Sequence, residues 1–138
     1  PMKRVTAFLI TTLVFLGLGC KEKTTETHTH DDQAVVKLDG GKKWLANAET
    51  TQGIQSMIVL TDGYLANPSP DLNLMKENLT SELTGIFQKC TMKGESHDQL
   101  HNYLLPLKKK IEALSSSGDV QTVEDIKIYL ETYKDYFE

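Results

Sequence analysis

The stretch DLNLMKENLTSELTGIFQKC, residues 71–90, carries the clearest structural pattern in the chain. Its apolar side chains recur every three or four residues, at Leu72, Met75, Leu79, Leu83, Ile86 and Cys90. This spacing lines one face of an α-helix and requires a second apolar surface to cover it. Ser69 suits the N-cap and Pro70 the first helical position. We therefore predict a helix from Pro70 to Cys90, with Cys90 on the buried stripe of its last turn.

Three further helices are predicted, over 42–65, over 96–114 and from an N-cap at Asp119 to Phe137. Each segment repeats apolar residues at helical spacing, and no segment shows the period-two alternation of a half-buried strand. The connections between these segments are short. Four helices of similar length with short connections predict an all-α fold, an antiparallel, up-down-up-down four-helix bundle.

Three residues within these segments have specific expected roles. Gly53 lies inside the first predicted helix, where glycine is unfavourable unless another element packs closely against it. Gly94 lies in the turn before the third helix and suits a positive φ angle. Pro106 lies inside the third helix and cannot donate a hydrogen bond to the carbonyl of Asn102, so we expect a kink there.

The first twenty residues have the organisation of an export signal. Lys3 and Arg4 precede a run from Val5 to Leu18 that is almost entirely apolar but short for a membrane span. The run ends at Gly19-Cys20, which resembles the signal of bacterial lipoproteins. The resemblance implies that residues 1–19 are removed, that Cys20 is lipidated and that the protein faces the periplasm or the cell surface. Several acyl chains together give stable membrane attachment.

The predicted layout places a flexible tether after the signal. Residues 20–40 would form the lipidated cysteine and tether, and residues 41–138 the bundle. From Lys21 to Asp32 there is no apolar side chain, so this stretch cannot contribute to a core. His28 and His30 within it suit either a soluble spacer or loose metal capture. The whole arrangement resembles the small helical lipoproteins of bacterial envelopes.

Charge and motifs exclude several classes of function. Without residues 1–19 the chain has 13 basic and 19 acidic side chains, a net charge of −6. An acidic chain without a basic stripe argues against nucleic-acid binding. No phosphate-binding glycine loop and no recognisable nucleophile motif is present, so we expect no enzyme. His97-Asp-x-x-His101 is similar to the His-Glu-x-x-His motif of zinc proteases, but Asp98 replaces the catalytic glutamate.

The stretch CTMKGESHDQLH, residues 90–101, concentrates metal-binding side chains. His97 and His101 are four apart and share a helix face, while Cys90 and Met92 precede them closely. A thiolate, a thioether and two imidazoles suit copper, above all Cu(I). Zinc would use Cys90, His97 and His101, with Glu95, Asp98 or water as the fourth ligand. We expect Trp44 and Tyr133 to shield the site at one end of the bundle.

Two other interpretations fit the same residues. Cys90 and Met92 can instead be core side chains, and the domain a metal-free module that binds a protein partner through Tyr129 and Tyr136. Non-covalent haem, held by His97 or His101 with Met92, is a minor alternative. A lone Cys90 thiol also leaves an intermolecular disulfide open.

Overall fold

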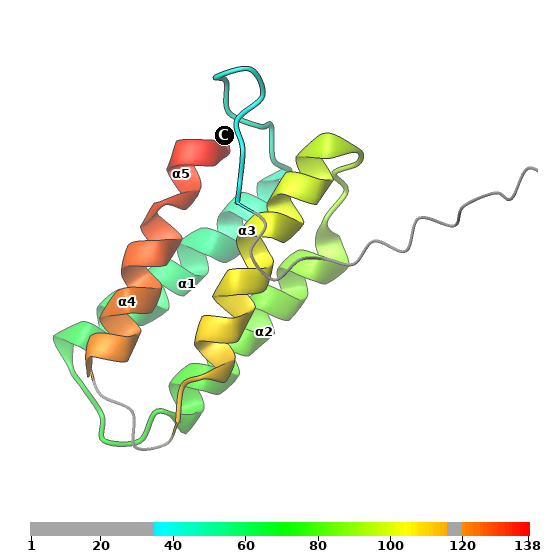
Figure 1. Cartoon of the computed structure of the whole chain (residues 1–138). Coiled ribbons are helices and arrows are strands. Elements are labelled where there is room, and N and C mark those ends of the chain that lie inside the picture. The colour runs from blue at the N-terminus through cyan, green and yellow to red at the C-terminus, as the bar shows by residue number, and fades with distance from the viewer. Residues whose placement is uncertain (1–34, 116–119) are drawn as a thin grey trace, which may run out of the picture.

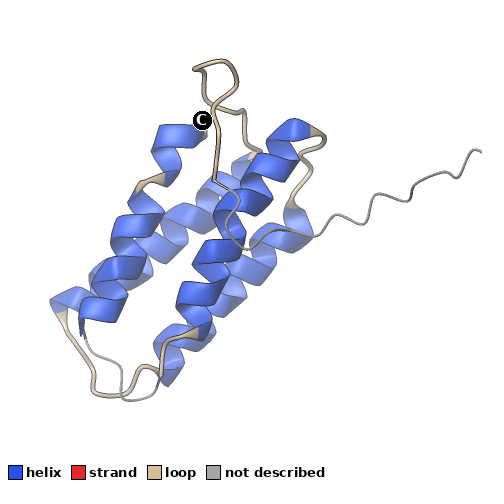
Figure 2. Ribbon diagram, viewed as in Figure 1, coloured by secondary structure: helices blue, strands red, loops and turns tan. Residues whose placement is uncertain are grey.

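The computed structural model describes residues 35–115 and 120–138 of the chain. These residues form five helices (Figure 1): α1 (Ala48–Ala66), α2 (Asn73–Lys89), α3 (Glu95–Glu112), α4 (Val120–Glu131) and the one-turn α5 (Tyr133–Tyr136). Figure 2 shows helices and loops and no strand in the described part. The predicted all-α class is confirmed. The expected signal, Cys20, most of the tether and the predicted cap Asp119 lie outside the described residues.

The four long helices surround one core. α1 packs against α2 and α4, and α3 packs against the same two helices, so the contacts form a closed ring. The core contains side chains from every helix and from the connections: Ile54, Met57, Leu72, Met75, Leu79, Leu83, Ile86, Leu100, Tyr103, Leu104, Leu107, Ile111, Leu114, Val123, Ile126, Leu130, Tyr133 and Phe137. No helix among the described residues is long and apolar enough to cross a membrane.

α2 buries the face that its sequence pattern predicts, from Leu72 to Ile86. It begins at Asn73, three residues later than expected, because the preceding side chains form local turns. The Asp71 N–H donates to Ser69 Oγ, and the Asn73 N–H donates to Asp71 Oδ1 at 2.9 Å. Such side-chain bonds compete with the helical backbone pattern. Cys90 follows the last helical residue and is half-buried, so its expected place in the last turn is corrected.

α1 begins at Ala48, six residues later than the sequence predicts. The residues before Ala48 form backbone hydrogen bonds with the C-terminal residues instead of helical hydrogen bonds. The Trp44 N–H donates to the carbonyl of Tyr136, and the Glu138 N–H donates to the carbonyl of Trp44 at 2.9 Å. Gly40, with φ of 55°, turns the chain before this pairing. Tyr136 and Glu138 lie more than ninety positions after Trp44 in sequence, so local periodicity does not show this pairing.

The last predicted helix is interrupted at Thr132. Its hydroxyl donates to the carbonyl of Tyr129 at 2.7 Å, and α5 follows as a separate turn. The expectations for Gly94 and Pro106 have different outcomes. Gly94 has φ of 63° and precedes α3, as predicted. Pro106 lies inside α3, and the kink there stays a prediction.

A pair of tyrosines joins α3 to α4. Tyr103 donates from its hydroxyl to the carbonyl of Tyr129 at 2.9 Å, and Tyr129 donates to the carbonyl of Tyr103 at 2.8 Å. Their rings stack with centroids 5.0 Å apart. Burial raises the pKa of both phenols, that of Tyr129 to about 12. These phenols therefore stay neutral donors over a wide range of pH.

Close packing between α1 and α2 depends on Gly53. A Cβ atom at this position would lie 2.5 Å from Cγ1 of Ile86, whose side chain is buried. We predict that Gly53→Ala lowers the free energy of unfolding by about 1–2 kcal/mol, because overpacking outweighs the gain of about 1 kcal/mol in helix propensity. Gly63→Ala, on the same helix with open space around it, is the control and should raise stability. Equal stabilisation of both variants in urea unfolding would contradict close packing at Gly53.

The raised tyrosine pKa values predict alkaline sensitivity. In the unfolded chain a phenol ionises near pH 10, whereas Tyr129 in the fold resists ionisation up to about 12. Stability should therefore be intact below about pH 10 and fall as the pH rises towards 12. Urea unfolding across this range measures the loss, and Tyr129→Phe should make the decline shallower. An unchanged slope in that variant would show that Tyr129 titrates alike in both states.

Candidate metal centre

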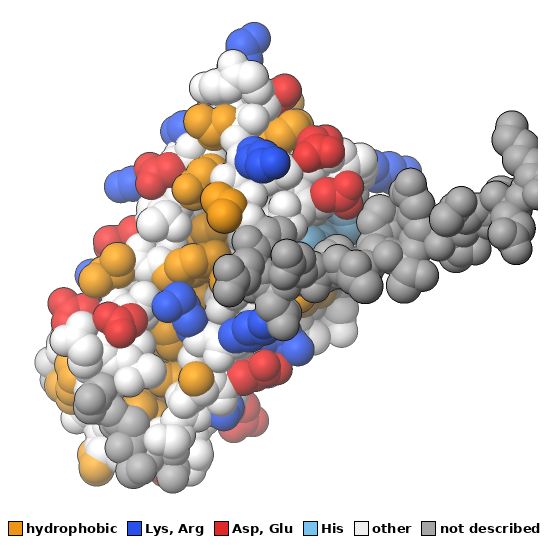
Figure 3. Space-filling view, in the orientation of Figure 1, with side chains coloured by type: hydrophobic (Ala, Val, Ile, Leu, Met, Phe, Trp, Pro, Cys, Tyr) orange, Lys and Arg blue, Asp and Glu red, His pale blue; other side chains and the backbone are white. Residues whose placement is uncertain are grey.

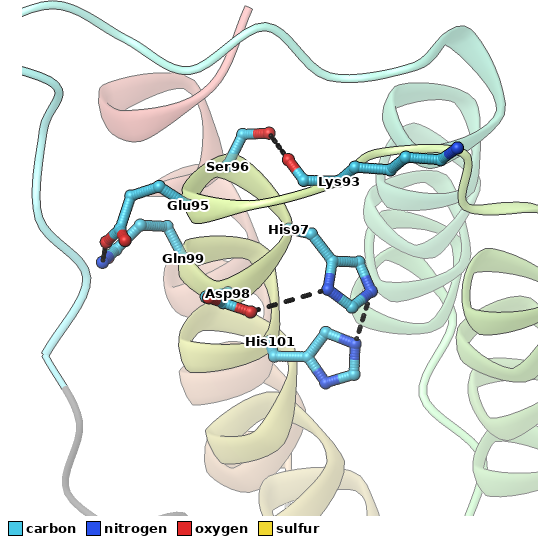
Figure 4. Close-up of polar contacts among 7 residues, drawn as sticks. All are labelled: Lys93, Glu95, Ser96, His97, Asp98, Gln99 and His101. Atoms are coloured by element: carbon cyan, nitrogen blue, oxygen red, sulfur yellow. Dashed lines mark hydrogen bonds and ion pairs between the residues drawn. The ribbon is translucent and has the colours of Figure 1, made fainter. Parts of the chain in front are cut away.

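Two histidines on α3 form the centre of the candidate site. His97 and His101 lie one turn apart, and their Nε2 atoms approach to 3.1 Å (Figure 4). The ring centroids are 4.4 Å apart and the rings are tilted by 53°. The His97 side chain is 38% exposed, and histidine atoms are visible at the molecular surface in Figure 3. The two Nε2 atoms are therefore hydrogen-bonded to each other, and the His97 ring is reachable from solvent.

The start of α3 orients this pair. Gly94 supplies the turn, and Ser96 Oγ donates to the carbonyl of Lys93. Asp98 Oδ1 lies 3.7 Å from Nδ1 of His97. This distance is too long for a hydrogen bond, so the Asp98 carboxylate acts on the His97 ring only as a nearby negative charge.

Side chains from α2 and α3 define the surroundings of the pair. The Phe87 ring packs against His101 with centroids 5.6 Å apart. Sequence periodicity does not indicate a role for Phe87, since this residue lies beside the predicted apolar stripe of α2 and only the helix packing brings it to His101. Glu95, an expected zinc ligand, accepts a hydrogen bond from Gln99 instead.

The separation of the two nitrogens suits one bound ion. With metal–nitrogen bonds of about 2.0–2.1 Å, a nitrogen–nitrogen distance of 3.1 Å corresponds to an angle of roughly 100° at the metal. Tetrahedral and square arrangements require angles near this value. Two histidines at this spacing on one helix face also form part of known zinc sites. The same contact is a hydrogen bond between the two Nε2 atoms, so one of these nitrogens must lose its proton before both can bind an ion.

Cys90 and Met92 are placed differently from the histidines. The described residues contain no group of three or more His, Cys, Asp or Glu side chains arranged to hold a metal. The expected set of Cys90, His97 and His101 is thus not assembled there. Burial raises the pKa of the Tyr133 phenol, and Cys90 lies close enough to this phenol to interact with it. Met92 is half-buried against the core.

Trp44 and Tyr133, expected as shields of the site, have structural contacts. The Trp44 indole N–H donates to the carbonyl of Lys37, and its backbone pairs with the C-terminal residues. The Tyr133 hydroxyl lies 3.1 Å from Thr51 Oγ1, and its ring stacks on Phe137. These contacts tie the segment before α1, and α1 itself, to the C-terminal residues.

The expected partner surface on the last helices is largely absorbed into the fold. Tyr129 is engaged with Tyr103, and Tyr136 is half-buried against the core. Exposed apolar side chains lie elsewhere, at Val59 on α1 and Leu74 on α2, which are 68% and 66% exposed. Val59 borders a groove of about 900 Å³ on α1 and, with Leu74, a second groove of about 450 Å³.

Comparison of the chain with family models, with curated proteins and with solved structures found no match. No residue role is therefore transferred from another protein. The histidine pair, its neighbouring carboxylate and its exposure are the observations on which a functional assignment stands.

Proposed function

We propose that this protein is an exported, membrane-anchored lipoprotein whose helical domain binds a transition-metal ion, with copper as the preferred metal. The converging Nε2 atoms of His97 and His101 carry the proposal. The half-exposed pair gives an ion direct access from solvent. In this proposal the two imidazoles are the primary ligands, and Cys90 and Met92 belong to the packing at the end of the bundle.

The choice of copper follows from ligand chemistry. Imidazole nitrogen binds copper and zinc well, and the affinity of such sites for divalent ions rises to copper and falls again at zinc. A thiolate and a thioether would favour Cu(I), but two imidazoles alone favour Cu(II) over Zn(II). Zinc is the second metal of the proposal. Binding at the envelope would suit a protein that holds or senses the ion outside the cytoplasm.

The proposal includes an antiparallel, up-down-up-down order of the four helices. Two hydrogen bonds support it. Asn47 Nδ2, at the start of α1, donates to the carbonyl of Lys89 at the end of α2. Lys76 Nζ, near the start of α2, donates to the carbonyls of Glu112 and Leu114 at the end of α3. Neighbouring helices thus bring opposite ends together.

A metal-free module that binds a protein partner is the second candidate function. In this function the partner would bind at the exposed side chains of Val59 and Leu74, which border two grooves, and not at Tyr129 and Tyr136. Non-covalent haem is the minor alternative, and a visible absorption spectrum would reveal it. Absence of metal binding in the experiment below would leave the partner-binding module as the better assignment.

The metal affinities of variants distinguish a site made by the two histidines from one that includes the Cys90 thiol. Residues 21–138, purified without a His-tag, should bind Cu(II), and Zn(II) more weakly, in competition titrations. We predict that His97→Ala/His101→Ala lowers Cu(II) affinity by about 100-fold or more, since the chelating pair is lost. Cys90→Ser should bind like the parent, because the thiol is not gathered with the imidazoles.

Circular dichroism of each variant is the control for folding. Parent-like affinity in the folded double histidine variant would overturn the proposed site. Loss of affinity in Cys90→Ser would return the thiol to the ligand set.

Variants of Cys20 and Cys90 test the proposed membrane anchoring. We predict that Cys20→Ser abolishes acyl labelling and moves the protein from the membrane to the soluble fraction, because the attachment point for the acyl chains is removed. Cys90→Ser should stay labelled and membrane-bound. Acyl labelling that persists in Cys20→Ser would refute a lipid anchor at this residue.

A further inference from the structure

The outward side of α1 carries no charge. Residues 50–61 contain no Asp, Glu, Lys or Arg, and no other described helix has an uncharged run of this length. The side chains of this run that line the side away from the buried Ile54 are Gln52, Gln55, Ser56, Val59 and Leu60, and we call them the α1 face. Charged residues are depleted in the same way at the centres of protein–protein interfaces.

Protruding side chains and hollows occur together on the α1 face. Val59 is exposed, and it borders both the groove of about 900 Å³ and the groove of about 450 Å³. Leu60 lines both grooves, and the exposed Leu74 of α2 borders the smaller one. A two-fold rotation places a protruding side chain of each copy over a hollow of the other. The shape of the α1 face therefore suits contact with itself.

The polar side chains of the α1 face can also pair with themselves. Gln52 and Gln55 line the larger groove, and each amide donates through its NH2 group and accepts through its oxygen. A charged side chain near a two-fold axis would instead meet its own charge on the second copy. The charged residues that border the two grooves are Glu82, on α2, and Asp71, in the turn before α2. Both carboxylates can accept hydrogen bonds from glutamine amides of a second copy.

The area of this surface suits a reversible dimer. The 19 residues of α1 give a length of about 28 Å, and the adjoining edge of α2 widens the surface to roughly 20 Å. Two copies would thus bury about 1,000–1,200 Å² in total, close to the lower end of specific interfaces, which begin near 1,200 Å². Chance contacts mostly bury less than about 800 Å².

We propose that the α1 face, with the adjoining edge of α2, binds a second copy of this chain across a two-fold axis. A different protein would have to supply its own matching surface, whereas a second copy brings the same neutral surface with its protrusions and hollows. α1 lies across the ring of helices from α3, which carries the histidine pair (Figure 1). The inference is independent of the proposed metal site.

Analytical ultracentrifugation of residues 21–138, which include the whole described core, tests this inference. A chelator is present so that no metal ion bridges two copies. The parent should shift from monomer to dimer as its concentration rises from the micromolar to the submillimolar range. Val59→Lys should raise the dissociation constant at least about 10-fold, because it places two like charges near the axis. Gln55→Lys is a second variant of the same face and should weaken association in the same way.

The matched control is Ile128→Lys, which puts the same charge at an exposed aliphatic residue of α4 outside the α1 face and should associate like the parent. Circular dichroism checks that each variant is folded. A parent that stays monomeric at the highest concentration would overturn the inference and leave the α1 face to a different protein. Parent-like association of the folded Val59→Lys and Gln55→Lys variants, or an equal loss in Ile128→Lys, would also overturn it. Cu(II) affinity is measured separately, so these outcomes leave the proposed function untouched.

Discussion

The fold depends on the packing of the apolar face of α2 against its neighbours. Leu79, Leu83 and Ile86 are almost completely buried, and each such side chain contributes about 1.5–3 kcal/mol when removed from water. Gly53 lets α1 approach Ile86 so closely that a methyl group would not fit. This packing fixes α2, and α2 in turn supplies the surface on which α3 and its histidines lie.

The second constraint is the closure at the end of the domain where α3 begins. Trp44 and Ala46 form backbone hydrogen bonds with the last residues of the chain. The indole N–H of Trp44 also donates to the carbonyl of Lys37. The backbone N–H of Lys37 in turn donates to the side chain of Gln99 on α3. These contacts connect both ends of the domain to the helix that carries His97 and His101.

Much of the fold follows from sequence periodicity, and the exceptions have physical causes. The apolar repeat of α2 and the positive φ of Gly94 could be predicted from the sequence, because both depend on nearby residues. The late start of α1 was not, since Trp44 pairs with residues far along the chain. Likewise, helical spacing placed His97 and His101 on one face but could not place Cys90, whose position depends on how α2 ends. The break at Thr132 depends on one side-chain hydrogen bond that periodicity does not record.

We propose that imidazoles of α3, and not the Cys90 thiol, hold the ion. X-ray absorption spectroscopy of residues 21–138 loaded with one equivalent of Zn(II), and in parallel with Cu(II), tests this most directly. The account predicts a first shell of nitrogen or oxygen, at about 2.0–2.1 Å for zinc, with outer-shell scattering from imidazole rings. A sulfur neighbour at about 2.3 Å from zinc would contradict it and restore Cys90 as a ligand.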